Sequence, residues 1–246
     1  MSSAAAAAPN DVVPPRQPTA IATAVPGLAL WCCPLRVEGA VRAQWAATLS
    51  PAERARADRF GTEALRSLYI AGRTTLRTLL AEALDASPAA VPLRRGSHGR
   101  PELDLPGRPL DFNVSHTREI AVIAILRHPP ASTRVGVDVE HLERELGADR
   151  LARRYLTARE RSHFDSLDDD ARRRRFLRLW TCKEAMSKAT GEGLRAPMGE
   201  LDVELGKRPR LVAGPHPYSP DDWQLLTLEL AGGYVTTLAL WTGAPE

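Results

Sequence analysis

Residues 176–190 read FLRLWTCKEAMSKAT, and the interpretation of the whole chain starts from this stretch. At helical spacing, Phe176 and Trp180 fall on one face, and Glu184 and Lys188 follow on the same face. The two aromatic residues predict that this face points inward, where charge is costly unless it is paired or bound. Two interpretations stay open. Glu184 and Lys188 form an ion pair on a face that turns toward solvent, or they line a site for a metal or a phosphate.

The composition is that of an ordinary globular protein without a nucleic-acid partner. The 246 residues are 43% hydrophobic and 26% charged, with a net charge of +3. Aromatic residues make up only 5%, and no nucleic-acid-binding signature occurs. The three cysteines lack the spacing of a zinc site and are interpreted as reduced thiols of a cytoplasmic protein. The arginine run 172–175 is interpreted as a solvated helix face or as a contact for an acidic partner.

Local patterns predict the following elements. A strand is expected at 27–35, followed by a short helix carrying Val41, Trp45 and Leu49, and by helices at 54–60 and 63–84. After a loop at 88–99, strands are expected at 101–105 and 110–114, and then at 119–126 and 134–140, the last two as an antiparallel pair. A strand around 201–205 and a hairpin of 223–230 with 234–241 complete the chain.

A repeated pattern predicts two similar halves. Ser50-Pro-Ala-Glu53 and Thr157-Ala-Arg-Glu160 are both capping boxes, and each is followed by a long helix and then strands. The expected fold is α+β, with two pseudo-duplicated halves, each a small, mostly antiparallel sheet packed with a long helix. The expected boundaries are a disordered Ala/Pro-rich tail at 1–26, an N-terminal half at 27–132 and a C-terminal half at 133–246. The active cleft is expected between the halves, and no segment has the length and apolarity to cross a membrane.

Two acids on a core strand suggest a magnesium site. In Gly136-Val-Asp138-Val-Glu140, the two-residue period of a strand places both carboxylates on one face and both valines on the other. Carboxylates near a third acid suit Mg²⁺, which keeps open positions for substrate phosphates. The alternative is a strand end that reaches solvent with two exposed acids.

Several further side chains are candidates for phosphate binding. Ser115 and His116 follow a short strand, and the alternative is a turn held by local hydrogen bonds. Neighbouring residues of an extended segment point in opposite directions, and no G-x-S-x-G surrounds the serine, so a Ser-His-Asp triad is discounted. Arg100, Arg66 and Lys188 offer cations, although each alone is an ordinary surface charge. P-loop and GxGxxG motifs are absent.

The ordered set Gly-Arg-Pro (99–101), Asn-Val-Ser-His (113–116), Gly-Val-Asp-Val-Glu (136–140) and Trp-Thr-Cys-Lys-Glu-Ala-x-x-Lys (180–188) resembles the 4′-phosphopantetheinyl transferases. The length and the apparent duplication resemble the two-half, monomeric surfactin-synthetase type. The resemblance covers nearly the whole chain from Leu49 onward. It implies transfer of 4′-phosphopantetheine from coenzyme A to a serine of an apo acyl or peptidyl carrier protein, with release of 3′,5′-ADP. Such carriers belong to polyketide or non-ribosomal peptide biosynthesis.

The resemblance also implies a role for each matching residue. Asp138, Glu140 and Glu184 would hold Mg²⁺, or Mn²⁺ in its place, on the pyrophosphate of coenzyme A. Lys188 would contact that pyrophosphate and assist the leaving group, Lys183 would lie near the coenzyme, and Glu184 is the candidate acceptor of the serine proton. Ser115 and His116 would bind a phosphate, Arg100 would lie beside the adenine nucleotide, and Arg66 would bind the 3′-phosphate.

One position departs from the family pattern. Glu53 stands where some relatives have a lysine near the coenzyme, and Arg54 and Arg56 are candidates to compensate. Two rival functions stay open at this point. One is a coenzyme A or carrier-binding module without catalysis, which the intact acid trio argues against. The other is a Mg²⁺-dependent phosphohydrolase, which would release 3′,5′-ADP without any carrier.

Overall fold

The computed structural model describes residues 17–35, 43, 45–96, 99–164 and 166–244. Its strands are β1 (Thr19–Ile21), β2 (Leu28–Pro34), β3 (Leu93–Arg95), β4 (Pro101–Leu103), β5 (Leu110–Thr117), β6 (Ile120–Arg127), β7 (Arg134–His141), β8 (Asp202–Glu204), β9 (Arg210–Ala213), β10 (Trp223–Leu230) and β11 (Tyr234–Trp241). Its α-helices are α2 (Pro51–Ala57), α3 (Glu63–Leu84), α4 (Ala148–Tyr155), α5 (Ala158–Ser162) and α6 (Asp169–Thr190), and short 3₁₀ turns lie at Pro88–Ala90, Gly193–Arg195 and Pro220–Asp222. The fold is therefore α+β.

Two antiparallel sheets form the centre of the molecule. The first has the strand order β1-β2-β6-β5, and the second has the order β10-β11-β7. The predicted antiparallel pair of β6 with β7 is wrong, because β6 lies between β2 and β5 while β7 pairs with β11. Two apolar runs joined by a short loop favour a hairpin from sequence alone. Here the chain crosses from one sheet to the other at that loop.

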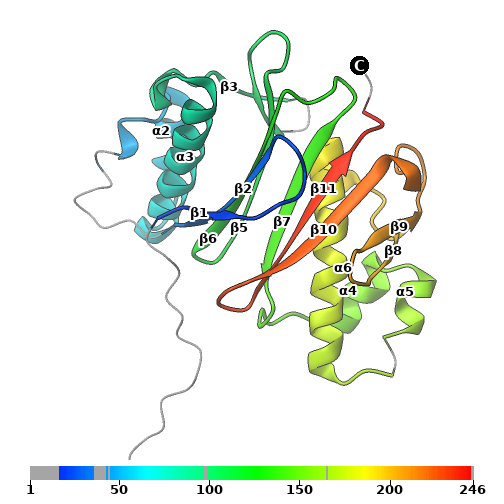
Figure 1. The fold of residues 1–246 in the computed structure, drawn as a ribbon. Helices are drawn as coiled ribbons and strands as arrows, with labels where there is room; N and C mark the ends of the chain where they lie inside the picture. The colour runs from blue at the N-terminus through cyan, green and yellow to red at the C-terminus, as the bar shows by residue number, and fades with distance from the viewer. Residues whose placement is uncertain (1–16, 36–42, 44, 97–98, 165, 245–246) are drawn as a thin grey trace, which may run out of the picture.

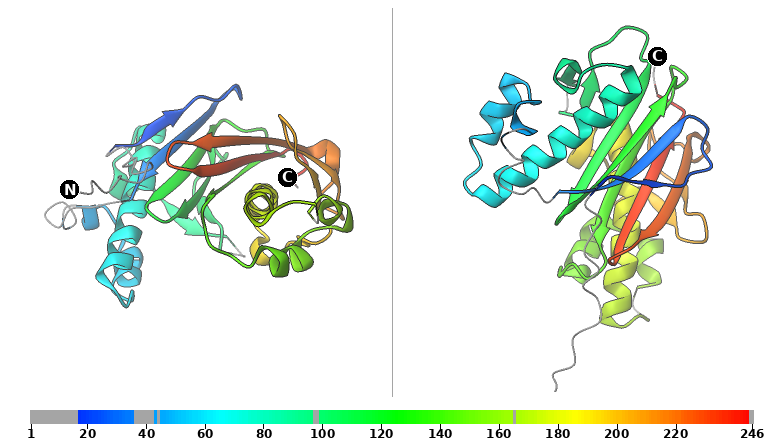
Figure 2. Two further views of the ribbon diagram at one scale, coloured as in Figure 1. Left: turned by 90° about the horizontal axis from the view of Figure 1, so that it is seen from below. Right: turned by 60° about the vertical axis from the view of Figure 1, so that its left-hand side comes forward.

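Three hydrophobic clusters of the described residues include side chains of the two sheets. One cluster packs α3 against β6, and another packs α6 against the second sheet. The third joins apolar side chains of both sheets, including Val122 of β6 with Val137 and Val139 of β7. Because β6 contributes Ala121, Ile123 and Ile125 to one cluster and the alternate residues to another, its apolar run is continuous. Figures 1 and 2 show α3 and α6 on opposite sides of the strands.

Locally determined elements follow the predictions closely. Helix α3 and both strands of the closing hairpin have the predicted bounds. Both capping boxes are present, although α2 begins at Pro51 and not at Arg54. The predicted tail is wrong at residues 19–21, which form β1, and the predicted loop is wrong at 93–95, which form β3. The rest of the tail up to residue 16 and Val41 of the predicted short helix lie outside the described residues.

Gly136 allows α6 to approach β7 closely. A Cβ atom at this position would lie 2.0 Å from the carbonyl oxygen of Ala185 and 2.7 Å from the backbone nitrogen of Ala189. Only glycine fits such a close contact between a strand and a helix. The small residue therefore brings the helix onto the strand that carries Asp138.

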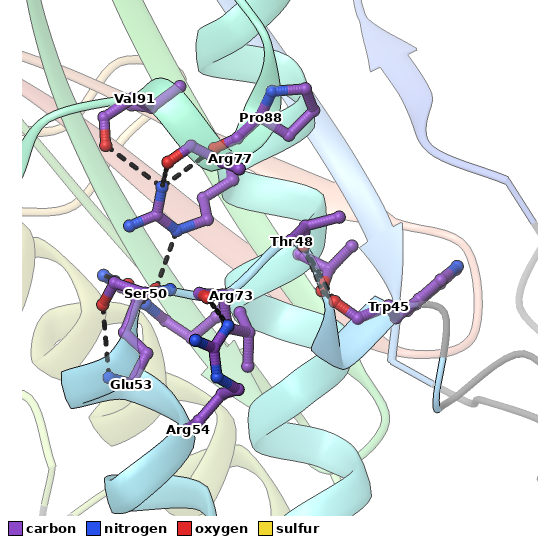
Figure 3. Close-up of polar contacts among 12 residues, drawn as sticks. Trp45, Thr48, Ser50, Glu53, Arg54, Arg73, Arg77, Pro88 and Val91 are labelled. Carbon is purple, nitrogen blue, oxygen red and sulfur yellow. Dashed lines mark hydrogen bonds and ion pairs between the residues drawn. The ribbon is translucent and has the colours of Figure 1, made fainter.

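At both capping boxes, the glutamate also binds a cation from the long helix that follows. Figure 3 shows Glu53, whose Oε2 accepts hydrogen bonds from Ser50 N at 2.9 Å and from Arg77 Nε at 2.7 Å. Arg73 Nε donates to its Oε1 at 2.9 Å. At the second capping box, Glu160 caps α5 and accepts a hydrogen bond from Lys183 Nζ at 2.6 Å. A buried acid is tolerated at both places because it is paired and hydrogen-bonded.

Candidate active site

Lys188 of α6 reaches across to β7 and β5. Its Nζ donates to Asp138 Oδ1 at 2.7 Å and to Ser115 Oγ at 2.8 Å, and Ser115 Oγ donates to Asp138 Oδ1 at 2.8 Å. Asp138 and Ser115 are buried, while Lys188 keeps about a quarter of its side chain exposed. The simpler sequence interpretation predicted an ion pair between Lys188 and Glu184, one helical turn earlier. In the structure, Lys188 pairs instead with Asp138 of the sheet. The lysine brings a positive charge to the junction of both sheets.

Two further acids beside this group, Glu184 and Glu140, have raised pKa values. Burial together with the charges of Asp138 and Glu140 raises the pKa of Glu184 to about 6, although Lys188 opposes the shift. Burial and Asp138 raise the pKa of Glu140, which pairs with Arg144 and accepts a hydrogen bond from Thr117 at 3.4 Å. The predicted alternation of β7 is confirmed, since Val137 and Val139 lie in the core between the sheets. The acids therefore share the opposite face of the strand.

The three predicted metal ligands are neighbours without forming a ready-made metal site. Within the described ranges, no three Asp, Glu, His or Cys side chains converge closely enough to hold an ion. Lys188 forms an ion pair with Asp138 Oδ1, and Arg144 forms one with Glu140 Oε1. However, Asp138 Oδ2 is buried and has no hydrogen-bond partner in the part of the chain that the structure describes. An unpaired carboxylate oxygen beside two acids of raised pKa suits a divalent cation, so the residues fit Mg²⁺.

A pocket of about 210 Å³ opens beside Lys188. It is lined by residues 99–101, by Asn113 and Val114 of β5, by Ser187 and Lys188 of α6, and by Gly191 and Gly193. Gly99, Gly191 and Gly193 have positive φ angles of 85°, 81° and 57°, which favour glycine in these two turns. The pocket therefore draws on two of the sequence motifs and on the turn that follows α6.

His116 lies beyond Ser115 on β5 with an exposed side chain. The protein packed around its ring and the charge of Lys188 lower the pKa of His116, and Asp138 opposes the shift. His116 is thus within electrostatic reach of the Lys188 group, and its neutral form prevails at neutral pH. The alternation of a strand directs Ser115 and His116 to opposite faces, as expected from the sequence.

Arg100 does not face the pocket with its guanidinium. The side chain is buried and pairs with Asp111, with Nη2–Oδ2 and Nη1–Oδ1 distances of 3.0 and 3.2 Å. Its remaining donors bind the carbonyl oxygens of Phe112, Val135 and Lys188. These contacts join β5, β7 and α6, and they use most of the guanidinium N–H groups. The guanidinium therefore lies at the junction of the two sheets and α6, and the contact of Arg100 with the coenzyme stays a prediction.

Lys183 is also directed inward. It is fully buried, and its three N–H donors bind Tyr155 O at 2.7 Å, Glu160 Oε2 at 2.6 Å and Met198 O at 2.9 Å. The predicted contact with the coenzyme is not supported by this placement, because no donor is available. A lysine next to Glu184 in the sequence points to the other side of the helix, where a carboxylate neutralises it.

The remaining predicted cations lie away from the Lys188 group. Arg66 is in the first turns of α3, where it pairs with Asp58, and no contact joins it to the pocket among the residues described. In the arginine run, Arg173 and Arg174 pair with Glu143, and Arg172 approaches Asp149. Much of the positive charge of this run is therefore neutralised within the protein. Glu53, which stands where some relatives have a lysine, binds Ser50, Arg73 and Arg77 through its carboxylate (Figure 3).

Sequence reasoning missed two residues of the junction, Asp111 and Asn113. Asp111 Oδ2 accepts from the backbone N–H of Val135 at 2.7 Å, and Asn113 Oδ1 accepts from that of Val137 at 3.1 Å. Ser115 Oγ lies 3.4 Å from the N–H of Val139 in the same way. Polar residues at every second position of an otherwise apolar strand were the available signal.

Comparison with known protein families agrees with these observations. Residues 134–239 match the family model described as the 4′-phosphopantetheinyl transferase superfamily, and residues 40–127 match the one described as 4′-phosphopantetheinyl transferase, N-terminal. The chain belongs to the 4′-phosphopantetheinyl transferase superfamily, and it is an enzyme of that class.

Individual relatives carry the same designation. The chain is 36% identical to the 4′-phosphopantetheinyl transferase HetI of Nostoc sp. over 178 residues, which cover 72% of this chain and 73% of the relative. It is 34% identical to a phosphopantetheinyl transferase of Thraustochytrium sp., covering 70% and 66% of the two chains. It is 24% identical to the 4′-phosphopantetheinyl transferase Sfp of Bacillus subtilis, covering 76% and 79%.

Proposed function

We propose that this enzyme transfers the 4′-phosphopantetheine group of coenzyme A to a serine of an apo acyl or peptidyl carrier protein and releases 3′,5′-ADP. One observation carries the proposal. In a chain of the 4′-phosphopantetheinyl transferase superfamily, Lys188, Asp138 and Ser115 meet at the junction of the two sheets beside a pocket lined by both halves. A cation beside clustered acids suits a diphosphate held together with a divalent metal ion.

We further propose that the reaction depends on Mg²⁺, held by Asp138, Glu140 and Glu184. The unpaired Oδ2 of Asp138 and the raised pKa values of Glu140 and Glu184 support this assignment. When bound, Mg²⁺ would neutralise charge on the diphosphate and orient it. Lys188, which is about a quarter exposed beside Asp138, would contact the substrate diphosphate.

In the proposed reaction, the protein side chains accept one proton and neutralise charge. The carrier serine oxygen forms a bond to the β-phosphorus of coenzyme A, and the bond from that phosphorus to the bridging oxygen breaks, so that 3′,5′-ADP leaves with the electron pair. Glu184 accepts the proton of the serine hydroxyl. Lys188 neutralises charge on the leaving group. Positioning and charge neutralisation therefore account for the proposed catalysis.

Several broader assignments belong to the same proposal. The protein acts as a monomer in the cytoplasm, on carriers of polyketide or non-ribosomal peptide synthases, without a nucleic-acid or membrane partner. No helix in the described part of the chain combines the length and apolarity needed to cross a bilayer. The two halves, with a boundary near Ser132 and the active cleft between them, are related by duplication. The matched positions of Glu53 with Arg77 and of Glu160 with Lys183 support that relation.

The test is the intact mass of a purified apo carrier protein after incubation with the enzyme, coenzyme A and Mg²⁺. The expected result is a gain of one phosphopantetheine group that is lost when a chelator is present. A carrier-free control measures 3′,5′-ADP, and its release there would indicate hydrolysis instead. Binding of coenzyme A without a mass gain on several unrelated carriers would indicate a binding module.

A further inference from the structure

Glu192 is an acid in the turn that lines the pocket of about 210 Å³. It lies between Gly191 and Gly193, which both line the pocket, whereas Glu192 is not one of the described lining residues. Within the described part of the chain, its carboxylate contacts the hydroxyl groups of Thr190 and Tyr218, and neither of these is a cation. A carboxylate without a counter-ion therefore lies next to the pocket that we assign to the diphosphate.

The hydroxyl of Tyr218 fixes the direction of this carboxylate. Tyr218 OH donates a hydrogen bond to Glu192 Oε2 at 2.5 Å, and Thr190 Oγ1 lies 3.0 Å from the same hydroxyl. Burial and the hydrogen bond to Glu192 raise the pKa of Tyr218, so the hydroxyl keeps its proton and remains a donor. A hydrogen bond to a carboxylate is stronger than one between neutral groups. The side chain of Glu192 is therefore held on Tyr218.

Tyr218 is itself held in place by a column of stacked rings. It is fully buried, and its ring lies parallel to that of Trp223, with 5.5 Å between the ring centroids. Trp223 stacks in turn on Trp241 at 5.7 Å, and these two residues belong to β10 and β11. All three rings are part of the hydrophobic cluster that packs α6 against the second sheet. Tyr218 thus directs Glu192 toward this cluster from a fixed position.

We infer that Tyr218 is a positioning residue, whose hydroxyl holds the carboxylate of Glu192 away from the pocket that takes the diphosphate of coenzyme A. This inference rests on the proposed function, because it concerns how the same pocket receives an anion. Coenzyme A carries several negative charges, and a carboxylate turned into the pocket from this position would repel them. The hydrogen bond from Tyr218 therefore favours binding of the substrate without touching it.

Substitutions at the two residues separate the charge of Glu192 from its hydrogen bond. Tyr218→Phe removes the donor and keeps the ring. Glu192→Asp keeps the charge on a shorter side chain, which loses the contact with Tyr218, and Glu192→Gln keeps the length without the charge. The double variant Tyr218→Phe/Glu192→Gln removes both the donor and the charge. Glu200→Asp, at an exposed acid, is the matched control.

The measurement is the dissociation constant of coenzyme A by isothermal titration calorimetry with Mg²⁺, at low and at high salt. Tyr218→Phe and Glu192→Asp should each bind about fivefold more weakly at low salt, and the loss should shrink at high salt because charges are screened. Glu192→Gln and the double variant should bind at least as tightly as the wild type. Titrations are made well below the thermal midpoint of each variant, so that a loss of affinity is not a loss of fold.

Two results would overturn the inference. If Tyr218→Phe and Glu192→Asp bind coenzyme A as the wild type does, Tyr218 serves only the core. If the double variant binds as weakly as Tyr218→Phe at either salt concentration, the shape of the turn decides affinity and the charge of Glu192 does not. Both results leave the proposed function intact, whereas failure of the wild type to bind coenzyme A would remove that function together with the inference.

Discussion

Lys188 and Asp138 are 50 residues apart in the sequence, and their Nζ and Oδ1 atoms lie 2.7 Å apart in the fold. The contact depends on Gly136, two residues before Asp138, because this glycine lets the backbone of α6 lie against β7. It also depends on Ser115, which binds both partners from the other sheet. This ion pair therefore depends on how the two sheets and the long helix α6 pack together.

Asp138→Ala should abolish transfer while the fold is kept. The substitution removes the counter-ion of Lys188 and the oxygen that we assign to Mg²⁺, so turnover should fall by at least about 100-fold. Binding of the carrier should be largely unchanged, because the aspartate is buried. Intact mass of the carrier over time measures turnover. The matched control is Asp221→Ala, which changes an exposed acid. Equal loss in both variants would contradict the assignment.

Glu184→Gln should stabilise the metal-free protein at neutral pH. An acid whose folded pKa of about 6 exceeds its ordinary value of 4.5 loses stabilising free energy as the pH rises through that window. After a discount for its partial exposure, the difference is about 1 kcal/mol. The free energy of unfolding is measured in urea at pH 4.5 and at pH 7.5. Between these two pH values, it should decrease more for the wild type than for the variant. A constant difference at both pH values would show that Glu184 is not perturbed.

The same variant should respond differently to magnesium. If Glu184 helps to hold Mg²⁺, the ion binds the folded wild type and raises its thermal midpoint at pH 7.5. The increase should be much smaller in Glu184→Gln, which keeps the shape of the side chain without its charge. An equal increase in both proteins would remove Glu184 from the proposed ligand set.

Gly136→Ala should be strongly destabilising. The added Cβ would lie 2.0 Å from Ala185 O, so the helix or the strand must move. A loss of about 3 kcal/mol is expected from overpacking against backbone, and it should come with weaker coenzyme A binding. Gly61→Ala is the matched control, since nothing lies within 4 Å of its added Cβ. Urea denaturation of both variants measures the difference, and equal stabilities would refute the close approach.

Lys183→Met should cost about 3–5 kcal/mol of stability, because it leaves the carboxylate of Glu160 buried without its counter-ion. The double variant Glu160→Gln/Lys183→Met should recover most of this loss, as a double-mutant cycle in urea would show. Coenzyme A affinity of the double variant should equal that of the wild type. A stable double variant that no longer binds coenzyme A would restore the family-implied role of Lys183 as a coenzyme ligand.

The helices and strands whose geometry depends on local sequence pattern could be predicted. The apolar spacing of α3, the capping boxes and the alternation of β7 specify their own geometry, and these predictions agree with the structure. The pairing of β6 was wrong because its apolar run reveals burial on both faces but not which strands lie beside it. Strand order is decided by distant segments, which a local pattern does not reveal.

The candidate site was predicted in part for a similar reason. Asp138, Glu184, Lys188 and Ser115 do lie together, as the order of the motifs indicated. Arg100 and Lys183 carry the charge expected of phosphate ligands, but each is bound by an acid from elsewhere in the chain, Asp111 and Glu160. The direction in which a cation points depends on where its nearest carboxylate lies. That carboxylate is identified only once the chain is folded.

The row formed by Asp111, Asn113 and Ser115 has a consequence for how this enzyme evolves. Strands within a sheet are joined through backbone atoms, which every residue except proline supplies alike, so such a joint tolerates most substitutions. Here β5 and β7 are the edge strands of two sheets, and side chains make the joint between them. Each of these hydrogen bonds can therefore be gained or lost by a single amino-acid substitution, so the joint between the two sheets can change one residue at a time.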